Sequence, residues 1–164
     1  MIRRVCSDDW KAIQTIWADE AKSIYAQFDK SNDLEDQAVA KRITMWASFA
    51  CGDEHIFLAV CLHKTVIGYI ALNRMECGYE IGYCFHSDYH GKGYAKESIS
   101  GALAYLKNKG SLRITAGTAL KNTPSVHLLH SLGFHQTGTE KLSFYKDADG
   151  KDIVFDGGIY ELLL

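Results

Sequence analysis

The sequence predicts an α/β (α+β) fold in which helices cover a mixed sheet, antiparallel at its ends and parallel in its middle. The prediction rests on three features: apolar residues recur at helical spacing in the first 50 residues, strand-favouring residues dominate residues 56–72, and a strand, a glycine turn, a helix and a strand follow one another over residues 79–116. Apolar residues three to four apart are typical of an amphipathic helix, and alternation with period two is typical of a strand. A strand–helix–strand succession predicts a parallel pair with a right-handed crossover.

The N-terminal part predicts a short strand over residues 2–6 and then two helices. Ser7 stands at the N-cap position of the first helix, and Asp8 and Asp9 follow in its first turn, where negative charge suits the helix dipole. A polar stretch, residues 29–36, separates this helix from the second. The apolar stripes of the two helices are Trp10, Ile13 and Trp17, and Val39, Ile43, Trp46 and Ala50.

The middle of the chain predicts a hairpin of residues 56–62 and 66–72, which are joined at His63 and Lys64. Residues 79–85 form a third strand with alternating apolar residues, and a glycine-rich turn leads into an amphipathic helix that Gly110 ends. The buried face of that helix consists of Ala95, Ile99, Ala102, Leu103 and Leu106, and the next strand covers residues 112–116.

The C-terminal part predicts a short helix over residues 124–132, with Asn122 or Thr123 as its cap and Pro124 in its first turn. Two further strands, residues 134–145 and 153–162, form a final hairpin that turns at residues 148–150. Pro124 is the only proline, and no linker or repeat interrupts the chain, so we expect one domain over residues 1–164.

Composition excludes several classes of function. The formal net charge of −2 gives no global attraction to nucleic acid or to an anionic membrane. The start of the chain is charged and does not resemble a signal peptide, and no apolar stretch reaches membrane-spanning length, so we expect a cytoplasmic protein. Five cysteines without CxxC spacing indicate reduced thiols, and the histidine pairs lack nearby ligands, so no metal is expected.

The turn that follows the third strand is the most informative segment. Residues 79–95 read YEIGYCFHSDYHGKGYA, so a strand runs through His90 and two glycines directly into a helix. Glycine permits positive φ and close approach of a ligand, and the unpaired N–H groups of a helix start attract phosphate. Lys92 adds a positive charge. The alternative is an ordinary tight turn, and the spacing fits neither a Walker loop nor a dinucleotide fingerprint.

The turn resembles motif A of the GNAT acetyltransferase superfamily, in which Gln or Arg is followed after two residues by Gly and after one more by Gly or Ala. Gly93 and Ala95 match this motif, and His90 stands where Gln or Arg is usual. The stretch EIGY at residues 80–83, the stretch NTPS at residues 122–125 with the LGF that follows it, and the final strand resemble the RimJ/RimL-type branch of ribosomal-protein N-acetyltransferases.

The resemblance implies that acetyl-CoA is the co-substrate and that two parallel strands, those ending at Phe85 and starting at Leu112, splay apart around its pantetheine arm. It also implies which residues bind the coenzyme. Backbone groups around Tyr83, Cys84 and Phe85 would pair with the pantetheine amides, and His90, Gly91, Lys92, Gly93, Tyr94 and Ala95 would hold the pyrophosphate. Asn122 would contact the pantetheine or cap its helix.

Catalytic roles follow from the same resemblance. Glu80 is the candidate base, acting through water, and its alternative is a structural hydrogen bond. Many family members protonate the leaving thiolate with a tyrosine at the position of Leu129, so Ser125 is the candidate substitute and Tyr145 the second candidate. A covalent route through Cys84 is the less favoured alternative, because no base adjoins this thiol in the sequence.

The expected reaction is acetyl transfer to a primary amine by direct attack in a ternary complex. An α-amine with a pKa of about 8 needs little help, whereas a lysine with a pKa of about 10.4 needs a base. The sequence does not identify the acceptor beyond a protein N-terminus or a small amine. The acidic residues between 29 and 36 either border the acceptor site and attract a cationic amine or form a solvated loop, which is the slightly favoured interpretation. The alternative is a non-catalytic module that binds acetyl-CoA. A monomer and a homodimer are equally compatible with the sequence.

Overall fold

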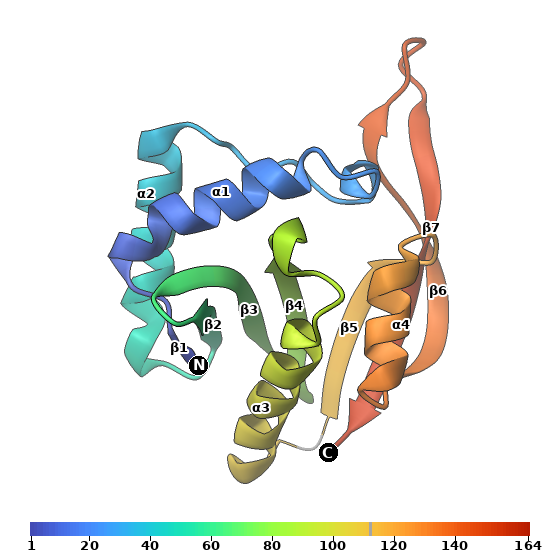
Figure 1. The fold of residues 1–164 in the computed structure, drawn as a ribbon. Coiled ribbons are helices and arrows are strands. Elements are labelled where there is room, and N and C mark those ends of the chain that lie inside the picture. Colours follow the sequence, from blue (N-terminus) through green and yellow to red (C-terminus); the bar gives the residue numbers. More distant parts are fainter. Residues whose placement is uncertain (112) are drawn as a thin grey trace.

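A seven-stranded mixed sheet forms the centre of the computed structural model, which describes residues 1–111 and 113–164 (Figure 1). The strands are β1 (Ile2–Arg4), β2 (His55–Leu62), β3 (Thr65–Met75), β4 (Gly78–Phe85), β5 (Arg113–Ala119), β6 (His135–Lys146) and β7 (Asp152–Leu163). They lie in the order β1-β2-β3-β4-β5-β7-β6. Only β4 and β5 are parallel among the described strands, and the other neighbours are antiparallel.

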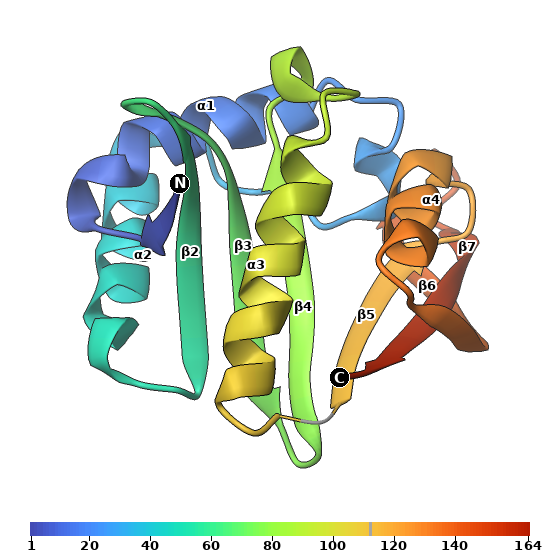
Figure 2. The same cartoon turned by 60° about the horizontal axis from the view of Figure 1, so that its bottom comes forward.

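Four α-helices cover the two faces of the sheet. They are α1 (Trp10–Glu20), α2 (Asp36–Ser48), α3 (Tyr94–Asn108) and α4 (Thr123–Ser131). The helices α1 and α2 pack on one face, and α3 and α4 pack on the other (Figure 2). Within the described part of the chain, no helix combines the length and the apolar character that crossing a bilayer requires.

The alternation of side chains along β2 divides the apolar residues between two cores. Ile56, Leu58 and Val60 face α3 and join the larger core, whereas Ala59 and Cys61 face α1 and α2. Successive side chains of a strand point to opposite faces of its sheet, so a strand covered on both faces is apolar at almost every position. This explains why the run at 56–62 contains no charged residue.

The predicted order of elements and the mixed sheet are confirmed, and two details near the helix ends were wrong. Ser7 is not the N-cap of a long helix, because a 3-10 turn (Ser7–Asp9) precedes α1 and Cys6 takes the cap position. Ala50 is exposed rather than part of the apolar stripe, because α2 ends at Ser48. The predicted strand start at Leu112 lies outside the described residues.

The turn between β3 and β4 fixes where β5 begins. Gly78 has a φ of +125°, and a Cβ placed on it would overlap the carbonyl oxygen of Arg113. Only glycine fits such a close approach with a positive φ. The starts of β4 and β5 are therefore pressed together at this end of the sheet, which is called the closed end below.

Candidate active site

The parallel strands β4 and β5 separate soon after they begin. They pair at only two positions, Tyr79 with Ile114 and Glu80 with Thr115, although β4 continues to Phe85. From Ile81 onward the edge of β4 that faces β5 has no strand beside it (Figure 1). An unpaired strand edge offers a row of N–H and C=O groups to an extended ligand. The predicted splayed pair is thus confirmed.

The turn after β4 exposes a row of backbone donors at the start of α3. No N–H group of residues 91–96, called the amide cradle below, donates to a protein acceptor within the described chain. Gly91 and Gly93 have φ values of +70° and +82°, and a Cβ on either would meet no atom within 4 Å. These donors and the dipole of a 15-residue helix create a positive site that is open to an anion.

The side chains of the turn hold its backbone rather than fill the amide cradle. His90 Nε2 lies 2.8 Å from the carbonyl oxygen of Phe85, so Nε2 must carry the proton in this bond. Lys92 Nζ donates to the carbonyl oxygen of Asp88 at 2.8 Å. The side chains of His90 and Lys92, which were predicted to contact the phosphates, therefore lie beside the cradle. The Nδ1 atom of His90 is directed away from the bond to Phe85.

Helix α1 anchors the same turn from the other side of the sheet. The backbone N–H and the hydroxyl of Ser87 donate to the Asp19 carboxylate at 2.7 and 2.8 Å. Burial acts to raise the pKa of Asp19, but the two bonds from Ser87 outweigh it, so the pKa lies below its usual range. Asp19 stays ionised and holds Ser87 in the turn that leads to the cradle, a role that the sequence did not reveal because the two residues lie 68 positions apart.

Two hydroxyl groups meet across the gap between β4 and α4. Tyr83 Oη and Ser125 Oγ lie 2.9 Å apart. Burial raises the pKa of Tyr83, and the bond to Ser125 opposes this shift only in part. Asn122 accepts from the Ser125 N–H at 3.3 Å, so its side chain caps α4. The structure therefore brings Tyr83, Ser125 and Asn122 together, and Thr123 is not the cap.

The other two catalytic candidates lie apart from this pair. Glu80 is exposed near the closed end, on the face of β4 opposite that of Tyr83, and no hydrogen bond fixes its carboxylate within the described chain. Tyr145 Oη donates to the carbonyl oxygen of Asp29 at 2.8 Å, so it fastens β6 to the segment between α1 and α2. The structure does not bring Tyr145 into contact with Ser125.

The Cys84 thiol lies among acidic side chains. Burial and then the nearby carboxylates of Glu20, Asp29 and Asp19 raise the pKa of Cys84 to about 12. Burial and then Asp29 also raise the pKa of Glu20 above its usual range. Cys84 is therefore a protonated thiol and a poor nucleophile near pH 7. Glu20 was missed because nothing in the sequence distinguishes it from a solvated residue at the end of α1.

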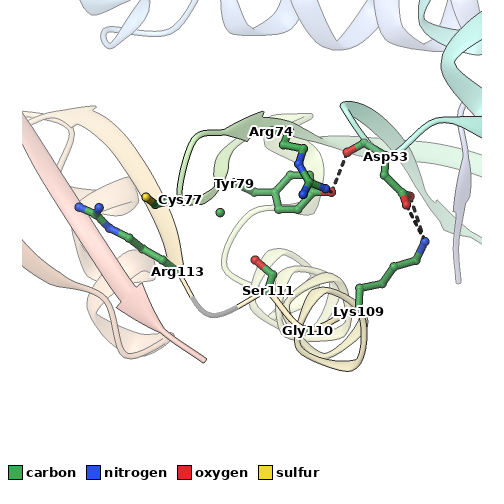
Figure 3. A pocket seen from close by; sticks show the side chains of 9 residues that line it. Asp53, Arg74, Cys77, Tyr79, Lys109, Gly110, Ser111 and Arg113 are labelled. Atoms are coloured by element: carbon green, nitrogen blue, oxygen red, sulfur yellow. Dashed lines mark hydrogen bonds and ion pairs between the residues drawn. The ribbon is translucent and has the colours of Figure 1, made fainter.

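Two cavities lie away from the amide cradle. One of about 390 Å³ is lined by residues of the segment after α1 and by Arg42 and Tyr69. The other, of about 410 Å³, lies at the closed end and is shown in Figure 3. Two of its three cations are ion-paired, because Lys109 pairs with Asp53 at 2.9 Å and Arg113 pairs with Glu161 at 2.6 Å, and the third, Arg74, lies over the Tyr79 ring. The described residues contain no cluster of three metal-ligating side chains.

Comparison with solved structures identifies the same architecture elsewhere. An acetyl transferase from Salmonella typhimurium that modifies the N-terminal serine of ribosomal protein L7/L12 gives a TM-score of 0.84 at 15% identity, over 99% of this chain and 94% of that one. The ribosomal-protein-S5-alanine acetyltransferase of Vibrio fischeri gives 0.82 at 17% identity, over 99% and 91%. A structure of yncA from Salmonella typhimurium with its cofactor acetyl-CoA gives 0.76 at 22% identity, over 100% and 93%.

Sequence comparison gives narrower matches to curated proteins. The uncharacterized N-acetyltransferase p20 of Bacillus licheniformis is 38% identical over 79 residues, and the uncharacterized N-acetyltransferase YnaD of Bacillus subtilis is 34% identical over 76 residues. These matches cover 48% and 44% of this chain and 41% and 45% of the relatives, so less than half of either relative is matched. The family model described as an acetyltransferase (GNAT) domain matches residues 1–135, from β1 to the start of β6. The chain therefore belongs to the GNAT acetyltransferase family.

Proposed function

We propose that this protein is an acetyl-CoA-dependent N-acetyltransferase that moves an acetyl group onto a primary amine. The observation that carries the proposal is the amide cradle at the wide end of the β4–β5 gap, where consecutive N–H groups have no acceptor in the described chain. Unpaired helix-start amides that face open space suit a pyrophosphate. The unpaired edge of β4 beside them suits the amides of a pantetheine arm.

In this proposal the coenzyme lies along β4 with its diphosphate at α3. The N–H groups of residues 91–95 donate to the diphosphate, and His90 adds a donor through Nδ1 when that nitrogen is protonated. Backbone groups around Tyr83, Cys84 and Phe85 pair with the pantetheine. This arrangement leaves the thioester in the gap between β4 and the start of α4, close to the Tyr83–Ser125 pair.

Direct attack of the amine on the thioester is the favoured mechanism. The new C–N bond forms as the C–S bond breaks, the nitrogen loses a proton, and the sulfur gains one. The raised pKa of Cys84 supports this route, because a thiol that is protonated at neutral pH cannot take the acetyl group readily. Glu80 accepts the amine proton through water, and Ser125 gives its hydroxyl proton to the thiolate.

The acceptor is expected to approach from the side of α1. Glu20, Asp29 and Asp19 surround Cys84 with negative charge on that face, which attracts a cationic amine. An α-amine has a pKa of about 8 and is partly neutral near pH 7, so it needs the least help from a base. One structurally similar protein modifies the N-terminal serine of ribosomal protein L7/L12, and another is a ribosomal-protein-S5-alanine acetyltransferase; this favours a protein amine over a small amine.

The test is acetyl transfer across a panel of amines. Purified protein is incubated with acetyl-CoA and with N-terminal peptides, polyamines and amino acids, while free thiol and acetylated product are followed together. Equal release of thiol and product on at least one amine is the expected result. Tight binding of acetyl-CoA by calorimetry without thiol release on any amine would instead assign the chain as a non-catalytic binding module.

A further inference from the structure

The cavity of about 390 Å³ lies on the α1 side of the sheet, next to the place proposed for the thioester. Tyr69 of β3 lines this cavity, packs against the core under α1 and α2, and pairs in register with Cys84 of β4. The side chains of directly paired residues lie on the same face of a sheet, with their Cβ atoms about 4.5–5.5 Å apart. The cavity is therefore one strand away from the proposed coenzyme, on the side from which the amine is expected to approach.

A fixed guanidinium forms part of the cavity wall. The exposed Arg42 of α2 lies over the rings of Trp17 and Trp46, with its Cζ atom 4.8 and 5.5 Å from their centroids. Its Nη1 donates to the side-chain oxygen of Asn32 at 2.8 Å. Within the described chain, no carboxylate lies at ion-pairing distance from Arg42. A guanidinium presents several N–H donors in a rigid fork, so most of these donors and the full charge are available to a ligand.

A phenol hydroxyl contacts the same indole ring. Tyr69 Oη accepts from the Trp17 Nε1–H at 3.0 Å and donates to no acceptor within residues 1–111 and 113–164. Burial raises the pKa of Tyr69, so the hydroxyl keeps its proton near pH 7. Trp17 thus contacts the Arg42 guanidinium through its ring face and the Tyr69 hydroxyl through its N–H group. The indole brings a charged donor and a neutral donor together at one cavity.

The charges around Cys84 and those around the cavity differ in sign. The groups nearest Cys84 are carboxylates, as described above. The cavity is lined by the cations Lys30 and Arg42 and by one carboxylate, Asp29, which belongs to both groups. The Asp29 carboxylate already accepts from the Lys30 backbone N–H at 2.7 Å. An acceptor with an amine at one end and an anionic group at the other would match this distribution of charge.

We propose that the acceptor is an amine that carries a carboxylate a few bonds away, and that Arg42 and Tyr69 bind this carboxylate while the amine attacks the thioester beside Cys84. The proposal rests on the proposed acetyl transfer and names the class of its substrate. The carboxylate comes either from a free amino acid or from an acidic side chain at a protein N-terminus. A guanidinium can bind a carboxylate through two parallel bonds, and a neutral amide of the same shape cannot replace it.

The test compares two pairs of acceptors that differ in a carboxylate: alanine with alaninamide, and a tripeptide amide that begins with glutamate with the same peptide that begins with glutamine. In Arg42→Gln, the ratio of kcat/KM for carboxylate over amide should fall about tenfold or more in at least one pair, which identifies the source, while kcat/KM for the amides stays within twofold. Tyr69→Phe should lower the same ratio about threefold.

Lys41→Gln is the matched control, because it removes the same charge from an exposed neighbour on α2. It should leave the ratio unchanged in both pairs. Comparing ratios between variants cancels the different basicities of the acceptor amines. An unchanged ratio in Arg42→Gln, an equal loss on all four acceptors, or the same change in Lys41→Gln would overturn the proposal. An unchanged ratio in Tyr69→Phe would remove Tyr69 from it.

A measurement without turnover keeps this inference distinct from the proposed function. The same four compounds are titrated by calorimetry into wild type and Arg42→Gln, each saturated with CoA. In wild type, a carboxylate compound should bind about tenfold more tightly than its amide, and Arg42→Gln should abolish the difference. If no amine is acetylated but this difference is present, acetyl transfer fails and the carboxylate site stands. If amines are acetylated but neither binding nor turnover depends on Arg42, the proposed function stands and this inference fails.

Discussion

The starts of α3 and α4 lie on the same face of the sheet but differ in how their backbone N–H groups are bonded. At α4, the Asn122 side chain accepts from Ser125, and Pro124 has no N–H to satisfy. At α3, Gly93 in the left-handed region takes the cap position and offers no side chain. A side-chain cap contributes about 0.5–2 kcal/mol to stability. The start of α4 is thus capped by its own side chain, whereas the start of α3 lacks this stabilisation and its N–H donors stay open to the proposed ligand.

The largest expected effect comes from placing a charge in the amide cradle. Gly93→Glu sets a carboxylate where the diphosphate is proposed to bind, on a residue with a φ of +82°. Like charges repel and the side chain occupies open space, so we expect the dissociation constant for acetyl-CoA to rise at least about 100-fold, or about 2.8 kcal/mol. Calorimetry measures the change directly.

Gly110→Glu is the matched control for this substitution. Gly110 follows the other end of α3, has a φ of +81° and is equally open, so both variants carry the same backbone strain. Gly110→Glu should lose the same stability and retain coenzyme affinity. Equal affinities of the two variants would remove the cradle from the proposed binding site.

The 3-10 turn (Ser7–Asp9) before α1 sharpens the comparison, because an ion pair holds it. The Asp9 carboxylate accepts from the Cys6 N–H at 2.9 Å and from both terminal nitrogens of Arg3 at 2.7 Å. Asp9→Asn removes the charge from bonds that contribute about 1.5–3 kcal/mol, so we expect unfolding free energy to fall by about 2 kcal/mol at pH 7. Urea denaturation measures this, and the exposed neighbour Asp8→Asn should change it by less than about 0.5 kcal/mol.

The same ion pair predicts that the free energy of unfolding depends on pH. Burial acts to raise the pKa of Asp9, but the bonds from Arg3 and Cys6 outweigh it and hold the pKa below its usual value of 3.8. A carboxyl with a lowered folded-state pKa stabilises the protein above the unfolded-state pKa, and this contribution is lost as pH falls through the folded value. The difference between wild type and Asp9→Asn should therefore shrink between pH 7 and pH 3. A constant difference would show that the charge of Asp9 is not its source.

The Ser125 hydroxyl lies in the first turn of the self-capped helix α4, and its proposed role differs from that of the cap. Ser125→Ala keeps the backbone N–H that bonds to Asn122 and removes only the partner of Tyr83. We expect kcat to fall about tenfold or more with coenzyme affinity unchanged. Ser131→Ala at the other end of α4 is the control, because its hydroxyl bonds only to the Leu128 carbonyl. Full activity of Ser125→Ala would make Ser125 structural.

Features that depend on neighbouring residues could be predicted from the sequence, whereas contacts between residues far apart in the chain could not. The cradle depends on glycines beside a strand and a helix, so a 17-residue window was enough to find it. Ser7 was taken as the cap of α1, whereas a 3-10 turn comes first, held by Asp9 through bonds to Cys6 and to Arg3 of the preceding strand. Ser125 was selected, but its contact with Tyr83, 42 residues away, depends on how far β4 and α4 separate.

Tyr160 and Glu20 are two further residues whose surroundings could not be predicted from the sequence. In the sequence, Tyr160 looks like one more apolar residue of a strand, and what distinguishes it is a buried hydroxyl without a partner among residues 1–111 and 113–164. Glu20 ends α1 and resembles a solvated carboxylate until Asp29 and Cys84 are seen beside it. Burial without a partner is a property of the packed chain and has no signature in residue spacing.

The smallest expected effect tests the self-capped helix start itself. Asn122→Ala removes the side-chain acceptor for the Ser125 N–H, so we expect the free energy of unfolding to fall by about 1 kcal/mol. Acetyl-CoA affinity should change less than twofold, because the amide cradle is untouched. Asn108→Ala at the end of α3 is the control and should lower stability by less than about 0.5 kcal/mol. If Asn122→Ala instead weakened coenzyme binding about tenfold with stability unchanged, the start of α4 would serve the ligand as the start of α3 does, and the contrast between the two helices would fail.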